Sequence, residues 1–133
     1  MLTATLSPGM NNMDVIETAK RMNHRINALE TARAHLHFLA TLKAESIALY
    51  EKVLAVTIIK IKNGMEVELQ GRHIVNPPVT IMEKIAKGIC WEEKLTMEKA
   101  EALYKAEVVS IQALTAELNG YQSINKYLGE VHD

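Results

Sequence analysis

The feature that most constrains the fold is an apolar pattern that recurs at steps of three and four residues near both ends of the chain. Such spacing places the apolar side chains along one side of a helix, and it predicts two long helices, over residues 12–54 and 97–128. We expect the two helices to pack antiparallel. The positions are Val15, Ala19, Met22, Ile26, Leu29, Leu36, Ala40, Ile47, Tyr50 and Leu54 in the first run, and Ala100, Tyr104, Val108, Ile111, Leu114, Leu118, Tyr121, Ile124 and Leu128 in the second.

The expected helix ends follow from capping residues. Residues 1–9 are expected to form a flexible arm, after which Asn11 and Asn12 offer N-cap side chains. Thr96 offers an N-cap for the second long helix, and Gly129 is expected to end it. Asn119-Gly120 interrupts that helix at a cost of about 1 kcal/mol relative to alanine.

The middle of the chain carries strand signals. Residues 55–62 are rich in β-branched side chains, and residues 65–70 alternate between apolar and polar. We therefore predict a β-hairpin over residues 56–70, with the loop Lys62-Asn63-Gly64 and Gly64 in a left-handed bulge position. In this register like side chains share a face: Ile61 pairs with Met65, Lys60 with Glu66, and Ile59 with Val67.

A short helix is predicted over residues 81–87. Pro77-Pro78 breaks the strand before it, Thr80 and Glu83 match a capping box, and Gly88 is expected to end it. Residues 89–96 suit either a helix or a turn. The predicted fold is thus mainly α, with a single helical domain over residues 10–133.

This order of elements resembles the layout of prefoldin subunits, which also place β-hairpins between two long helices. The resemblance is one of layout without a shared motif. Pro77-Pro78 and the short helix over 81–87 depart from it.

Composition narrows the class of protein. The 133 residues carry a net charge of −1, which argues against a dedicated nucleic-acid binder and permits copies of the chain to associate. Cys90 is the only cysteine, so an internal disulfide and sites built from several thiolates are excluded. The sequence shows neither a signal peptide nor a membrane-spanning run of apolar residues. We expect a cytoplasmic protein that has no membrane contact and no cofactor.

Residue types that could carry chemistry do not form a recognisable active site. His35 and His37 are two residues apart in a predicted helix, so they point in different directions and do not suit one metal ion. Cys90 has no histidine near it in sequence, and we expect a buried cysteine beside a core tryptophan, Trp91. An enzyme would need a pocket near His73, Cys90 and Trp91. No familiar catalytic motif is present, and we favour a non-enzymatic function.

The sequence carries more apolar side chains than two helices can cover. Past residue 36 the first stripe widens, and an isolated β-hairpin needs a cover as well. We expect a homo-oligomer that acts by binding another macromolecule, such as a protein, in the manner of small accessory or inhibitor proteins. An intramolecular bundle of three or four helices is the alternative. The predicted interface consists of Phe38, Leu42, Leu49, Val53, Ile59, Ile61, Met65, Val67 and Leu69.

A basic cluster on the first helix supports a second hypothesis. Lys20 and His24 share one line of the helix, and Arg21 shares another with Arg25, with Arg33 two turns beyond. These side chains could hold phosphates, which would make the chain a nucleic-acid-associated protein. The alternative is a solvated face between acidic neighbours. The predicted phosphate-binding residues are Lys20, Arg21, Arg25 and Arg33.

Overall fold

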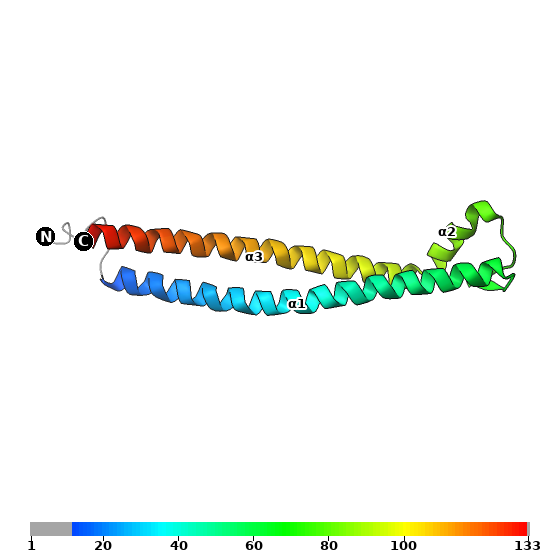
Figure 1. Ribbon diagram of the computed structural model, residues 1–133, viewed down its shortest axis with the longest axis horizontal. Coiled ribbons are helices and arrows are strands. Elements are labelled where there is room, and N and C mark those ends of the chain that lie inside the picture. Colours follow the sequence, from blue (N-terminus) through cyan, green and yellow to red (C-terminus); the bar gives the residue numbers. More distant parts are fainter. Residues whose placement is uncertain (1–11, 133) are drawn as a thin grey trace. The chain divides into compact units, whose positions relative to one another are not determined.

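The computed structural model describes residues 12–132, within which lie three helices and a two-stranded antiparallel β-hairpin (Figure 1). The elements in chain order are α1 (Asn12–Lys62), β1 (Val67–Leu69), β2 (Arg72–Ile74), α2 (Val79–Ile89) and α3 (Trp91–His132). The mainly α prediction is therefore confirmed, with the hairpin and the short helix between the two long helices. The expected arm over residues 1–9 and the capping residue Asn11 lie outside the described residues.

The chain divides into two compact units. The described part of the first unit comprises residues 12–36 and 106–132, and the second unit comprises residues 37–105. Each unit therefore holds one segment of α1 and one segment of α3, and the second unit also holds the hairpin and α2. The predicted extent of a single domain stays a prediction.

In the first unit the two helical segments run antiparallel. Met22, Arg25 and His35 of α1 contact Asn125, Glu117 and Glu107 of α3, respectively. The partner number falls as the α1 number rises, which is the sign of an antiparallel pair. Leu29 and Ala32 are buried in this unit, and Leu29 belongs to the apolar stripe that the sequence predicts.

In the second unit α2 packs against α1 and the hairpin, and the three elements form a small core. Ile61 of α1 is buried with Met82, Ile85 and Ala86 of α2. Because α2 has one strongly apolar side, it can cover the hairpin and the end of α1 together. The partly buried side chains around this core are Leu54, Ile58, Val67, Ile74 and Ile89.

The long helices are also antiparallel in the second unit. Lys43 lies over the ring of Tyr104, 4.7 Å from its centroid, and Lys94 lies over the ring of Tyr50 at 5.3 Å. Both contacts hold an ammonium against an aromatic face, an arrangement that stabilises by about 0.5–1 kcal/mol at exposed sites. Tyr50 itself is buried, together with Leu39, Ser46, Thr57 and Ala100.

The prediction of a first hairpin strand within residues 55–62 is wrong, because these residues continue α1. The residues Asn63-Gly64 end this helix instead of turning a hairpin. The amide of Met65 donates to the carbonyl of Lys60 at 3.0 Å, and that of Gly64 to Ile61 at 3.1 Å. These two bonds form a Schellman motif, in which Gly64 takes the left-handed conformation with φ of 75°. Burial of Ile61 against α2 stabilises the helical conformation of this β-branched segment.

The turn of the observed hairpin lies seven residues farther along the chain than the predicted turn at Asn63-Gly64. This turn is Gln70-Gly71, with φ of 49° and 78°, so both central residues take the positive φ that a type I′ turn requires. The predicted pairs of Ile61, Lys60 and Ile59 with 65–67 are therefore absent from the sheet. The register pairs Val67 with Ile74, Glu68 with His73, and Leu69 with Arg72.

The junctions of α2 also differ from the capping pattern. The helix begins at Val79 after Pro78, and no side chain caps it, so the predicted capping box of Thr80 is wrong. It continues through Gly88 to Ile89, and Cys90 separates it from α3, which starts at Trp91. Residues 91–96 are therefore helix. Gly120 and Gly129 lie inside α3 and do not interrupt it.

Candidate functional site

A row of exposed apolar side chains on α1 is a candidate site of the second unit. These side chains form what we name the α1 stripe, and each is at least one third exposed. Their exposed fractions are 57% for Phe38, 36% for Leu42, 49% for Leu49, 42% for Val56 and 57% for Ile59. Exposed apolar side chains that gather on one side of a helix are typical of an interaction site, whereas scattered apolar residues are not.

The stripe follows a seven-residue repeat. Leu42, Leu49 and Val56 are seven residues apart, and Phe38 and Ile59 belong to a neighbouring row with the same repeat. Such spacing keeps two rows of side chains on one side of a helix over several turns. The stripe is separate from the residues that α1 buries in the second unit, which are Leu39, Ser46, Tyr50, Thr57 and Ile61.

Two charged residues lie within the stripe. Glu45 and Lys52 occupy the same row as Phe38 and Ile59, seven residues apart from each other, and both are exposed. Neither takes part in an ion pair with another residue in the range 12–132. The stripe therefore offers apolar ends and an apolar middle, with opposite charges on either side of the middle.

The structure separates the predicted interface residues into two groups. Phe38, Leu42, Leu49 and Ile59 belong to the α1 stripe, and Met65 is exposed just beyond the helix. The remaining residues are wholly or partly covered: Ile61 is in the core, Val67 packs against that core, and Val53 and Leu69 are half-buried.

Sequence reasoning missed Val56 as a member of the stripe. It placed residues 56–62 in a strand, where alternation rather than the heptad decides which side a residue faces. The signal that could have found Val56 is its spacing of seven residues from Leu49, which itself lies seven residues from Leu42.

The basic cluster lies around a surface hollow in the first unit. Lys20, Arg21, His24 and Arg25 of α1 line it together with Tyr121 of α3, and its volume is about 510 Å³. The structure thus brings three of the four predicted phosphate-binding residues together. Arg33 does not line this hollow.

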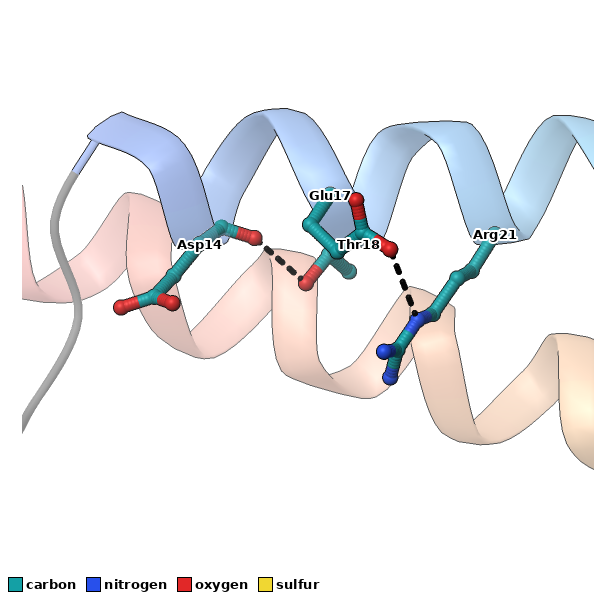
Figure 2. A network of polar contacts seen from close by, with 4 residues as sticks. All are labelled: Asp14, Glu17, Thr18 and Arg21. Atoms are coloured by element: carbon teal, nitrogen blue, oxygen red, sulfur yellow. Dashed lines mark hydrogen bonds and ion pairs between the residues drawn. The ribbon is translucent and has the colours of Figure 1, made fainter.

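Two of the cations at the hollow already have carboxylate partners. Arg25 Nε lies 2.5 Å from Glu117 Oε2, and Arg21 Nε lies 3.4 Å from Glu17 Oε1. Figure 2 shows the second pair one turn apart on α1, beside the bond that the Thr18 hydroxyl donates to the Asp14 carbonyl at 2.9 Å. These carboxylates reduce the positive charge that a phosphate would meet.

The residues of the enzyme hypothesis do not converge on one pocket. Cys90 is buried, with its sulfur 3.4 Å from the Thr57 hydroxyl. Trp91 is 58% exposed, so the expectation of a core tryptophan is wrong. A hollow of about 550 Å³ beside Trp91 is lined by Leu69, Gln70 and Gly88.

Two histidines have carboxylate neighbours, but neither belongs to a metal-binding group of the described residues. His35 Nδ1 contacts Glu107 in the first unit, and His73 Nδ1 lies 3.3 Å from Glu66 in the second. Throughout residues 12–132, no group of three or more histidine, cysteine, aspartate or glutamate side chains is placed to hold a metal ion.

No protein-family model, curated protein or solved structure matches the chain. Within the part of the chain that the structure describes, no helix has both the length and the apolar character needed to cross a membrane. The fold and the exposed surface therefore define the class: a mainly helical protein with a β-hairpin and an apolar stripe on its first helix.

Proposed function

We propose that the chain is a non-enzymatic protein that self-associates through the α1 stripe and acts by binding another macromolecule. The exposed heptad of large apolar side chains on α1 is the observation that carries this proposal. The single cysteine is buried and unpaired, which suits a reducing compartment, and we place the protein in the cytoplasm.

The apolar area of the stripe is large enough to offset much of the cost of self-association. Burying a large aliphatic or aromatic side chain from full exposure contributes about 1.5–3 kcal/mol. The members of the stripe are about half exposed, so five of them in each of two copies would contribute on the order of 10 kcal/mol. This gain is comparable to the cost of association, about 4–15 kcal/mol, and further contacts of the same surfaces add to it.

A separate exposed surface could serve the macromolecular partner. Trp91 is exposed at the start of α3, beside the hollow formed with Leu69 and Gly88. Tryptophan is enriched among the residues that contribute most to binding between proteins. This surface supports a protein partner for the self-associated chain.

Light scattering on three proteins tests the proposal. Leu49→Gln places a polar group in the middle of the stripe, and Leu103→Gln makes the same change at a similarly exposed leucine of α3. We expect the wild type and Leu103→Gln to have the mass of a dimer or larger assembly, and Leu49→Gln to be a monomer with unchanged helix content. A monomeric wild type would contradict the proposal, and so would an assembly that both substitutions leave intact.

A nucleic-acid-associated function is the second candidate, and the hollow lined by Lys20, Arg21, His24 and Arg25 favours it. If the hollow binds phosphate, its affinity for an RNA or DNA oligonucleotide will fall as the salt concentration rises. The reason is that binding releases counterions from the nucleic acid, and a higher salt concentration opposes that release. Lys20→Glu should weaken that binding, whereas Lys84→Glu on α2 provides a control of equal charge change in the other unit. Binding that Lys20→Glu leaves unchanged would exclude the hollow as the site.

A further inference from the structure

The α1 stripe has an order of side chains that reads nearly the same in both directions. From its middle at Leu49, the next large apolar residues are Leu42 and Val56, each seven positions away. Phe38 and Ile59 form the two ends. A surface that is symmetric under reversal of the helix direction is suited to pair with a copy of itself running the opposite way, because a twofold axis presents the same surface on both copies.

The two charges of the stripe follow the same symmetry and change sign across it. Glu45 lies four residues before Leu49, and Lys52 lies three residues after it. In an antiparallel pair centred near Leu49, Glu45 of each copy lies close to Lys52 of the other. In a parallel pair in register, Glu45 faces Glu45 and Lys52 faces Lys52. Opposite charges across a helix pair favour an orientation, and like charges disfavour it.

The side of α1 that packs toward α2 and the hairpin is not the side that carries the stripe. The α1 residues that pack toward α2 and the hairpin are Leu54, Ile58 and Ile61. Successive residues of an α-helix are rotated by about 100°, so these three lie on a different side from Leu42, Leu49 and Val56. The segment from residue 38 to 59 is roughly 33 Å long, which is enough for several turns of contact between two helices.

We propose that two copies of the chain form an antiparallel dimer through the α1 stripes, centred close to Leu49. This proposal rests on the proposed self-association and adds its direction, its register and the source of its specificity. Leu42 of one copy packs near Val56 of the other, and Phe38 packs near Ile59. Each dimer holds two Glu45–Lys52 pairs between copies, one on either side of the centre.

Cross-linking of single-cysteine substitutions distinguishes the two directions. In the antiparallel dimer, two Leu42→Cys copies place their thiols roughly 21 Å apart along the helix axis, so a short bismaleimide should not join them. A mixture of Leu42→Cys and Val56→Cys copies should be joined, and Leu49→Cys should join to itself. The wild type, whose Cys90 is buried, provides the background. Efficient joining of Leu42→Cys to itself would overturn the antiparallel arrangement.

Charge reversal supplies an independent test by sedimentation equilibrium. Glu45→Lys turns both attractive pairs of the antiparallel dimer into repulsive ones, and we expect the dissociation constant to rise about tenfold. The double variant Glu45→Lys/Lys52→Glu exchanges the two charges and should restore the wild-type value. A dimer that Glu45→Lys leaves unchanged would overturn the register while leaving the proposed self-association in place. A monomeric wild type would overturn both.

Discussion

Replacement of Ile61 by alanine tests the helical continuation of α1 through residues 55–62. Ile61 is 1% exposed, and truncation to alanine removes three carbon groups, at a cost of about 2.4 kcal/mol in lost transfer free energy. The space left in the core adds about 1 kcal/mol, so we expect the free energy of unfolding to fall by about 3 kcal/mol. Ile59 is 57% exposed, and Ile59→Ala should cost about 0.5 kcal/mol, because alanine's better helix propensity offsets part of the loss.

Urea denaturation followed through the fluorescence of Trp91, the only tryptophan, measures both changes in the second unit. Both variants are best compared in a Leu49→Gln background, so that loss of self-association does not contribute. At a slope of about 2 kcal/mol per molar, Ile61→Ala should lower the midpoint by roughly 1.5 M and Ile59→Ala by only a few tenths. Residues two apart share a face in a strand but not in a helix. Equal losses at the two positions would therefore refute the helical assignment.

Three further predictions concern two glycines and the cysteine. Gly64→Ala should destabilise the protein by about 1–2 kcal/mol, because Gly64 has a φ of 75° and an added Cβ would lie 3.3 Å from Asn76 Oδ1. Gly120→Ala should instead stabilise the first unit by up to about 1 kcal/mol, since Gly120 is helical with open space around it; thermal unfolding monitored by circular dichroism compares the two. Cys90 should react with a thiol reagent only as fast as the second unit opens, and rapid reaction of the native protein would contradict its burial.

The long helices were predictable because their apolar spacing persists over many turns. Leu29, Tyr50 and Ala100 belong to the predicted stripes, and all three are buried in the structure. The short helix was predictable from the break at Pro77-Pro78, although α2 extends two residues farther at each end than the prediction of 81–87. Signals that depend on many residues, or on the fixed geometry of proline, are stronger than those that depend on one capping side chain.

The hairpin could not be placed correctly, because its signals were ambiguous. The residues Asn63-Gly64 suit both a hairpin turn and the left-handed end of a helix, and the β-branched run before them favours a strand. Burial of Ile61 against α2 outweighs that local preference, and no contact with α2 can be read from the sequence. The observed turn at Gln70-Gly71 gave little signal, because glutamine is not among the residues typical of that turn.

The candidate interface was predictable only in part. Phe38, Leu42 and Leu49 widen the stripe of the first helix, and this widening is visible in the sequence. Ile59 and Ile61 are the same residue type in the same apolar segment, yet Ile61 is buried and Ile59 is exposed. The difference in exposure between the two residues depends on which side of α1 packs against α2, and the sequence does not show that contact.

Self-association through α1 is the central claim, and sedimentation equilibrium of the wild-type chain over a wide range of concentrations tests it most directly. We expect a reversible rise from the mass of one chain, 14.9 kDa, to twice that value as concentration increases. A mass that stays at 14.9 kDa up to high concentration would contradict the claim and would leave the α1 stripe as an exposed surface without a second copy to cover it.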